Sequence, residues 1–506
     1  MAISFNRIPT NLRLRLYWAE MDPSRAGTFS NNRRILVLGH GTGTVADNTL
    51  TRLGSINGAS RAAQGRGSML ERMSVKLRGA NGFDDVWFVD VPEPSAGTAA
   101  TGTIEVTAAA TAAGVLYLYI AGQKVSVAIA SGDTATQVAT KVKTAIDAAL
   151  DLPVTCARTN AVLTLTCRWK GLTGNDIDIR TNYLRNLGSE ALPAGVALTI
   201  TAMASGAGVP DLTDAIAAIG DEEFETIVHS WTDTATLNAI DTAWGHGDDG
   251  RWGWLKQLYG HVWSMRPGTF GDLGTFGDAR NGGEQTTIGY TGSPSPPWEW
   301  AGAIGGVVHR ALMNDPARPL GTLEVPGVLA ADPADRLTAG EKNALLWDGI
   351  SVVDETADGR IVINQVVTHY QRNAFGLDDN SLLKVNTKAT YAYVMRSQRF
   401  HIAQRFPRHK IANDGTRFGA GQAITTPTGI KAEIYAHYVA MENLGLLENA
   451  ATAMRNTIVE RDVTNPDRVN VLYAPDFVNQ LDVFAVIAQF RLQYPAETGE
   501  VAIPVI

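Results

Sequence analysis

The residues whose types and spacing come closest to a chemical motif are residues 41–46, Gly-Thr-Gly-Thr-Val-Ala, which follow an apolar run. They match the pattern G-x-G-x-x-A, whose glycines let the backbone and a helix N-terminus approach a pyrophosphate. A dinucleotide site also needs a helix directly after the loop and an acidic residue about 20 positions later. Gly54 and Gly58 interrupt such a helix, and residues 48–70 contain no Asp or Glu. We therefore interpret the loop as a structural turn, with a cytoplasmic nucleotide-binding α/β enzyme as the alternative.

The other polar residues do not form a recognisable active-site motif. None of the nine histidines belongs to an H-E-x-x-H or H-x-H pair, and no G-x-S-x-G nucleophile motif occurs. Residues 175–178 and 245–250 offer oxygen ligands, but they lack the twelve-residue spacing of a calcium loop that ends in Glu. We therefore predict no catalytic residue, no metal site and no cofactor, and a protein that is not an enzyme.

One stretch of charge stands out in an otherwise acidic chain. Residues 381–413 contain no Asp or Glu and carry seven positive charges: Lys384, Lys388, Arg396, Arg399, Arg405, Arg408 and Lys410. One interpretation is a solvated helix face that acidic loops balance, and a second is an electrostatic docking face for an acidic protein surface. A third is nucleic-acid binding, with Tyr391, Tyr393 and Phe400 available to stack on bases.

The elements that would position these residues follow from the apolar periodicity. Residues 33–39 and 85–91 read as buried strands, and the helix between them has Met69, Met73 and Leu77 at four-residue spacing. Strand, helix and strand in this order predict a parallel βαβ unit. The α/β alternation resumes after residue 208, and the longest helix candidates are residues 384–404 and 427–446.

Composition excludes several classes of protein. The chain has 506 residues, which suggests two or three domains at roughly 150 residues each. Its 45% apolar and 19% charged residues exclude a disordered chain, and no run approaches the 18 apolar residues of a membrane span. The net charge of −8 disfavours nucleic acid as a partner. The N-terminus has no apolar signal region, as expected of an unprocessed cytoplasmic product.

A change of composition marks an inserted domain. Residues 95–208 are rich in Ala, Thr and Gly, and they read as short strands around one helix that Asp133 would cap. Residues 92–94 and 205–210 read as two hinges, since insertions are tolerated in loops. We therefore predict an α/β (α+β) body with a mixed sheet, divided into residues 31–94 and 209–464, and an inserted outer β-rich domain at residues 95–208. Residues 1–30 and 465–506 would form linking arms.

Both ends of the chain carry alternating apolar residues. The apolar positions are Leu12, Leu14 and Leu16 near the start, and Phe484, Val486, Ala488, Phe490 and Leu492 near the end. A strand with one apolar face and free backbone groups pairs with a sheet edge, in its own chain or in a neighbour. Two different arms make contacts that are not self-complementary, and such contacts build rings or open helices. The pattern predicts a polymerising structural protein whose subunits exchange strands.

Several segments resemble the Mu-like contractile bacteriophage tail sheath proteins. The most specific is residues 466–481, Pro-Asp-Arg-Val-Asn-Val-Leu-Tyr-Ala-Pro-Asp-Phe-Val-Asn-Gln-Leu, which resembles the C-terminal signature of that family. The opening Ile-Ser-Phe-Asn-Arg-Ile-Pro at residues 3–9, together with the strand at 35–39, is similar to the family's start. Residues 65–70, Gly-Arg-Gly-Ser-Met-Leu, resemble its loop-to-helix turn, and residues 102–206 resemble its variable outer domain.

This resemblance implies a function, a set of partners and a location. Sheath subunits stack as hexameric rings around a tail tube protein, and the helical sheath contracts to drive the tube through the host envelope during genome ejection. The implied further partners are baseplate and tail terminator proteins, with no direct nucleic acid and no membrane insertion. The implied location is the virion tail, after assembly in the host bacterial cytoplasm.

The resemblance also suggests roles for parts of the chain. It implies that the inserted domain faces outward, that the basic stretch 384–410 faces the tube or a neighbouring subunit, and that the terminal arms tether subunits. Another self-assembling shell protein stays open as an alternative, because it would share the arms without the two helical states.

Overall fold

The computed structural model describes residues 34–493. Its body contains one eight-stranded sheet with the order β15-β14-β13-β12-β11-β1-β3-β2. The six inner strands run parallel, whereas the edge strands β2 and β15 are antiparallel to their neighbours. The strands are β1 (Arg34–Gly39), β2 (Leu50–Leu53), β3 (Asp85–Asp90), β11 (Thr226–Val228), β12 (His261–Pro267), β13 (Gln285–Tyr290), β14 (Ile350–Glu355) and β15 (Ile361–Gln365). The predicted α/β class with a mixed sheet is confirmed.

The body helices connect and cover these strands. They are α1 (Gly58–Gln64), α2 (Met69–Ala80), α5 (Thr213–Ile219), α6 (Thr234–Trp244), α7 (Phe270–Asp278), α8 (Pro297–Asn314) and α9 (Ala339–Trp347). The predicted parallel βαβ unit is present, since α2 joins β1 to β3 with Ile35 opposite Val86. The Ser68 side chain starts α2 by accepting a hydrogen bond from the Glu71 N–H. No helix in residues 34–493 is long and apolar enough to cross a membrane.

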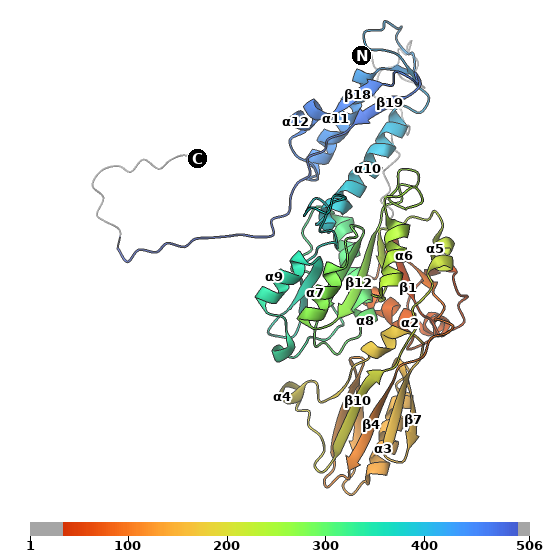
Figure 1. The fold of residues 1–506 in the computed structure, drawn as a ribbon, viewed down its shortest axis with the longest axis vertical. Helices are drawn as coiled ribbons and strands as arrows, with labels where there is room; N and C mark the ends of the chain where they lie inside the picture. The colour runs from red at the N-terminus through yellow and green to blue at the C-terminus, as the bar shows by residue number, and fades with distance from the viewer. Residues whose placement is uncertain (1–33, 494–506) are drawn as a thin grey trace, which may run out of the picture.

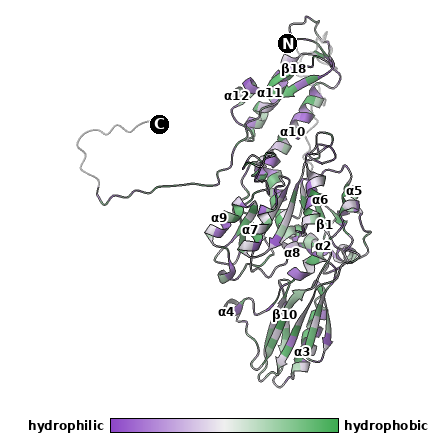
Figure 2. Ribbon diagram, viewed as in Figure 1, coloured by the Kyte–Doolittle hydropathy of each residue, from purple (hydrophilic) through white to green (hydrophobic). Residues whose placement is uncertain are grey.

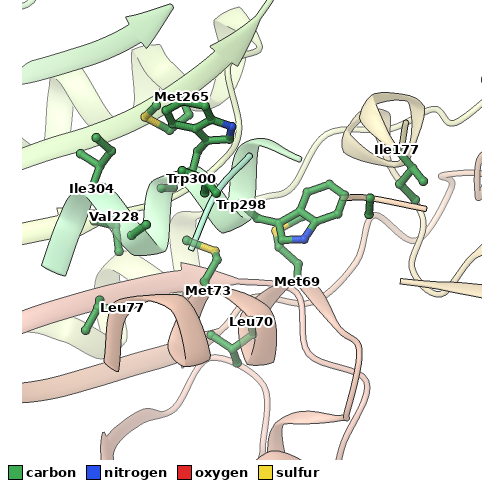
Figure 3. Close-up of a cluster of buried hydrophobic side chains, with 14 of the residues drawn as sticks. Met69, Leu70, Met73, Leu77, Ile177, Val228, Met265, Trp298, Trp300 and Ile304 are labelled. Atoms are coloured by element: carbon green, nitrogen blue, oxygen red, sulfur yellow. The ribbon is translucent and has the colours of Figure 1, made fainter. Parts of the chain in front are cut away.

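The body core depends on a close approach between α2 and α8. Figure 3 shows Met69, Met73 and Leu77 of α2 beside Trp298, Trp300 and Ile304 of α8, with Val228 of β11 next to them. Glycines in α8 permit this distance. A Cβ built on Gly302 would lie 2.3 Å from the Met73 carbonyl oxygen, and one on Gly305 would lie 2.3 Å from a Val228 methyl carbon.

Residues 98–207 form a separate β-rich part, which lies at the lower end of Figure 1. One sheet has the order β10-β4-β8-β7 and the other β6-β5-β9, with α3 packed against strands of both. Figure 2 shows apolar residues along these strands, as in the body sheet. The elements are β4 (Thr101–Ala108), β5 (Gly114–Ile120), β6 (Gln123–Ile129), α3 (Ala135–Ala148), β7 (Val154–Thr159), β8 (Val162–Cys167), β9 (Ile179–Thr181), α4 (Arg185–Gly188) and β10 (Ala197–Ala204), with a short 3-10 turn, η2 (Leu172–Asp176), before β9.

One detail of this part differs from the sequence expectation. Thr134, not Asp133, is the N-cap of α3, and it forms a reciprocal capping box with Gln137. Asp133 instead accepts hydrogen bonds from the Ala130 N–H and the Lys141 ammonium. The Thr-x-x-Gln pairing satisfies two backbone groups of the first turn, so it fixes the helix start one residue later.

The β-rich part is firmly seated on the body. Thr98 and Ala207 pair through two backbone hydrogen bonds, so the two connections lie side by side. Asp151 contacts the guanidinium groups of Arg61 and Arg66, and Trp169 packs edge-on against Trp298 with ring centroids 5.0 Å apart. These contacts exclude a loosely tethered appendage.

The last part of the described chain has its own small core at the upper end of Figure 1. Apolar residues of α10 and α11 meet there around the fully buried Tyr438. The elements are α10 (Val385–Arg405), β16 (Lys410–Ile411), β17 (Ile424–Thr425), α11 (Pro427–Asn443), α12 (Ala450–Asn456), β18 (Ile458–Arg461) and β19 (Val469–Leu472). Strands β18 and β19 form an antiparallel hairpin. The expected arm boundary at residue 465 falls inside that hairpin, so the free part of the chain begins further on.

Candidate inter-subunit surfaces

The most unusual surface is the C-terminal extension, residues 483–493, which leaves the body as a long trace in Figure 1. Its apolar side chains are almost fully exposed: Phe484 by 83%, Phe490 by 86% and Leu492 by 98%, while Val486 is exposed by 67% and Ala488 is also exposed. The expected strand at these residues does not form. A strand needs a paired neighbour for its backbone groups, and no described part of the chain supplies one.

The extension has a fixed starting point. The Asp482 carboxylate accepts a hydrogen bond from the Gln365 side-chain amide of β15, 3.2 Å away, and it forms an ion pair with Lys384 at the start of α10. Lys384 therefore anchors the extension instead of presenting a free charge. The three N-terminal candidates Leu12, Leu14 and Leu16 lie outside the described residues.

Two sheet edges differ in whether they can accept a further strand. Edge strand β15 is already covered, because residues 322–325 hydrogen-bond to Ile361 and Ile363 along it. The β18–β19 hairpin has no third strand among the described residues. Val459 and Tyr473 pack on the small core below the hairpin, while Ile458 and Leu472 are exposed by 52% and 61%. This hairpin is thus an open, partly apolar sheet edge in that region, and it is longer than the other two-stranded sheet there, β16–β17.

Two members of the basic stretch are buried in ion pairs. Lys388, exposed by only 4%, pairs with Glu284, and its ammonium lies 4.3 Å from the Trp252 ring centroid. Burial alone would raise the pKa of Glu284, but the hydrogen bond from His246 and the charge of Lys388 outweigh it and lower that pKa to about 2. The carboxylate is therefore ionised, and the expectation that Lys388 belongs to an exposed face is wrong.

Arg396 is the second buried cation of α10. Its guanidinium pairs with Glu223 at 2.7 Å and with Glu225 at 2.6 Å, and it donates to the Tyr259 carbonyl oxygen. Arg396 is exposed by only 6%, so it does not belong to an exposed face either. Lys388 and Arg396 together fix α10 to the body, and we call this contact the α10 seam.

The remaining cations lie toward the end of α10. Arg405 pairs with Glu433 of α11 at 2.7 Å. Arg399, Arg408 and Lys410 are exposed, and no carboxylate within residues 34–493 lies at ion-pair distance from them. Tyr391, a candidate for stacking on bases, instead packs against Trp252 and Tyr259. The exposed charge therefore concentrates at one end of the helix.

The glycine loop at residues 41–46 is not a phosphate cradle. The Thr42 N–H donates to the Gln64 carbonyl, the Thr44 and Val45 N–H groups donate to the Ala63 carbonyl, and the Gly41 N–H donates to Asp90. A Cβ on Gly43 would lie 2.1 Å from the Ala63 oxygen, so α1 fills the space that a ligand would need. The next element is strand β2, not a helix. The nucleotide-binding alternative is wrong for this loop.

Sequence reasoning missed the carboxylates that organise these surfaces. Glu223, Glu225 and Glu284 meet α10 from positions more than 100 residues earlier in the chain, and Asp482 fixes the extension from 98 residues beyond Lys384. Only the absence of acidic residues within the basic stretch hinted that its partners lie elsewhere.

The chain combines an α/β body, a seated β-rich insertion and an apolar extension that is unpaired among the described residues, an architecture suited to a structural protein. Models of three phage tail sheath domains match in succession: the beta-sandwich domain at residues 95–208, the central domain at 205–369 and the C-terminal domain at 378–491. The Mu-like prophage FluMu tail sheath protein of Haemophilus influenzae is 39% identical over 496 residues, which cover 97% of this chain and 100% of that relative. The chain belongs to the phage tail sheath protein family, and its role is that of a tail sheath structural protein.

Solved structures of sheath proteins are similar over most of the chain. The sheath tail protein of Desulfitobacterium hafniense is 12% identical, with a TM-score of 0.48, over 92% of this chain and 97% of that one. The helical sheath of the anti-feeding prophage in its contracted state is 10% identical, with a TM-score of 0.48, over 96% and 100%. The sheath tail protein of Listeria innocua is 11% identical, with a TM-score of 0.45, over 90% and 94%.

Proposed function

We propose that this chain polymerises into a helical sheath of stacked hexameric rings around a tail tube, and that its terminal arms link neighbouring subunits. The observation that carries the proposal is the C-terminal extension, whose apolar side chains are exposed and whose backbone has no partner in the described chain. Exposing large apolar residues in this way is unfavourable for a monomer in water. Pairing with a second copy would bury them.

The acceptor for the arms is the β18–β19 hairpin. A two-stranded sheet is marginally stable on its own, and adding strands at its edges satisfies more backbone groups. The extension starts at Asp482, which is fixed beside β15, so a copy's own arm is directed away from its body. A neighbour's hairpin is the open edge that the arm would reach.

Contraction then requires two packings of the same subunit. The arms keep subunits connected while contacts between bodies break and form again, and the free-energy difference between the two packings drives the tube through the host envelope. The buried ion pairs of the α10 seam and the contacts of Asp151 make each subunit stiff. Movement would therefore concentrate in the arms.

The finer partners follow from the same proposal. The sheath would contact a tail tube protein along its length, and baseplate and tail terminator proteins at its ends. Arg399, Arg408 and Lys410 would face the tube or a neighbour, because they are exposed members of the basic stretch without a carboxylate partner among the described residues. The subunit would assemble in the host bacterial cytoplasm, act in the virion tail, and need no catalytic residue or cofactor.

Electron microscopy of the full-length chain, expressed alone, tests the proposal. We expect long hollow tubes with helical striations from the full chain. Deleting residues 483–506 should abolish the tubes and leave a folded monomer. This deletion keeps Asp482, so the contact of Asp482 with the body is preserved. A full chain that stays monomeric at high concentration would overturn the proposal.

A matched pair of variants tests the strand-exchange step. Phe484→Asp with Phe490→Asp alters the alternating apolar face, and Gln489→Asp with Gln493→Asp adds the same charge to the opposite face. We expect the first pair to prevent tube formation and the second to allow it. Equal behaviour of both pairs would contradict pairing through one apolar face.

A further inference from the structure

An exposed apolar surface surrounds a cleft of about 640 Å³ where α7, α9, β15 and the start of α10 meet. Trp347 lines the cleft and is 79% exposed. Phe375 and Leu377, exposed by 88% and 65%, lie on a loop whose two ends, Arg372 and Asp378, also line it. Large apolar side chains gathered in this way mark an interaction surface.

The same cleft carries unpaired negative charge. Its lining includes Asp278, Asp348, Asp378 and Asp379, and none of these carboxylates has a described Lys or Arg within ion-pair distance. Of the two cations in the lining, Lys384 is engaged by Asp482, and Arg372 is exposed. The Asp379 carboxylate accepts hydrogen bonds from the Tyr370 hydroxyl and from Ser381, but no described Lys or Arg neutralises it. An exposed indole beside carboxylates without a cationic partner is suited to a guanidinium, which stacks on the ring and pairs with the acids.

A complementary surface exists on the same chain. Beyond the end of α10, Arg408, Lys410 and Arg417 are exposed without a described carboxylate partner, and Phe418, which follows Arg417 in the chain, is 45% exposed. We call these residues the basic tip. The cleft begins at Lys384, at the other end of the 21-residue helix α10. That helix is about 30 Å long, so the tip does not reach its own cleft.

We propose that the basic tip of one subunit docks in the acidic, Trp347-lined cleft of a second copy of this chain. The inference rests on the proposed function and names a contact between bodies, separate from the arms. The two surfaces differ, so the contact is heterologous and propagates from copy to copy, as a helical assembly requires. Arginine stacking on Trp347 and burial of Phe418 would add apolar area to the charge pairing.

Charge reversal on each surface, alone and together, tests this contact in the full chain. Asp278→Lys with Asp378→Lys reverses the cleft, and Arg408→Glu with Arg417→Glu reverses the tip. We expect either pair to raise the protein concentration needed for assembly roughly tenfold or more, since like charges then face each other. The chain carrying all four changes should assemble at a protein concentration within about threefold of that of the original chain. The two surfaces then attract each other again, with their charges exchanged.

The control is Asp248→Lys with Asp249→Lys, an adjacent exposed acidic pair away from the cleft lining, which should leave assembly unchanged. Reversed surfaces that assemble normally would overturn the proposal. So would four changes that fail to rescue, a result that would point instead to a different partner, such as the tube protein.

A cross-linking experiment separates this contact from tube formation. A full chain carrying Trp347→Cys and Arg417→Cys should form a series of disulfide-linked oligomers on mild oxidation, seen as a ladder of bands on a non-reducing gel. A chain with either cysteine alone should give nothing larger than a dimer. The ladder is expected even if the chain forms no tubes, in which case only the proposed function fails. Tubes without a ladder would overturn the docking contact and leave the proposed function intact.

Discussion

At the scale of single residues, the α10 seam decides how the helix attaches to the body. Lys388 and Arg396 are cations in an interior environment, and they are tolerated there because carboxylates from distant parts of the chain meet them. Breaking a buried pair leaves an uncompensated charge, which is much more costly than losing an exposed pair. We therefore expect the ion pairs of the α10 seam to contribute measurably to the stability of the body.

We predict that Glu284→Gln destabilises the body by about 3–5 kcal/mol, because Lys388 stays buried without its partner charge. The measurement is the shift of the urea unfolding transition. Asp358→Asn, which removes one partner of the exposed Asp358–Arg360 pair, serves as the control and should leave the transition where it is. Similar shifts for the two variants would mean that the seam is not a source of stability.

The buried histidines predict a loss of stability in acid. Burial lowers the pKa of His229, His261 and His369 to about 3, from 6.5. Between pH 6.5 and pH 3 the unfolded chain binds protons that the folded chain does not, so these groups lower stability as the pH falls through that window. Above pH 6.5 they make no pH-dependent contribution.

His369→Gln should reduce this slope. Each such histidine contributes about 1.4 kcal/mol per pH unit in the middle of the window, and the variant lacks one of them. Unfolding transitions followed from pH 7 to pH 4 give the slope, with the exposed His409→Gln as the control. An unchanged slope for His369→Gln would show that this imidazole is not held neutral by burial.

At the scale of elements, the spacing between α2 and α8 depends on the absence of a side chain at particular positions. Gly302→Ala would place a methyl group against the Met73 carbonyl, which is backbone and cannot swing aside. We predict a destabilisation of roughly 1–3 kcal/mol, as for other overpacked cores. The unfolding transition of the purified variant measures it.

Gly79→Ala in α2 is the matched control for this prediction. A Cβ there meets nothing within 4 Å, so alanine should stabilise the helix by roughly 0.5–1 kcal/mol. If the free energy of unfolding falls for Gly302→Ala and rises for Gly79→Ala, the effect of packing is separated from the effect of helix propensity. If both variants were more stable than the original protein, the two helices would be able to move apart without cost.

At the scale of the whole molecule, the β-rich part is joined to the body by more than its two connections. Trp169 of the β-rich part packs edge-on against Trp298 of the body, and both side chains are almost fully buried. Asp151 of the β-rich part contacts two arginines of the body. Since Thr98 and Ala207 are paired, a short linker can replace everything between them.

We predict that replacing residues 99–206 by a short Gly-Ser linker leaves tube formation intact and lowers the melting temperature of the body, because Trp298 becomes exposed. Electron microscopy and thermal unfolding measure the two effects. Loss of tubes by a variant that is still folded would place the β-rich part in the contacts between subunits.

Local pattern was enough to predict much of this protein. Apolar periodicity located the β1-α2-β3 unit and the long helices expected at residues 384–404 and 427–446, where α10 and α11 lie, because a helix or a buried strand is specified by neighbours a few residues away. Alternation alone did not determine whether residues 484–492 form a strand. That depends on a paired edge, and within the described chain residues 484–492 pair with none.

Tertiary structure decided which charged residues are exposed. Seven cations in one acid-free stretch looked alike in the sequence, yet the fold buries Lys388 and Arg396 and exposes Arg399, Arg408 and Lys410. Their partners Glu223, Glu225 and Glu284 come from more than 100 residues away. Burial and pairing depend on which segments the sheet and helices bring together, and no local spacing contains that information.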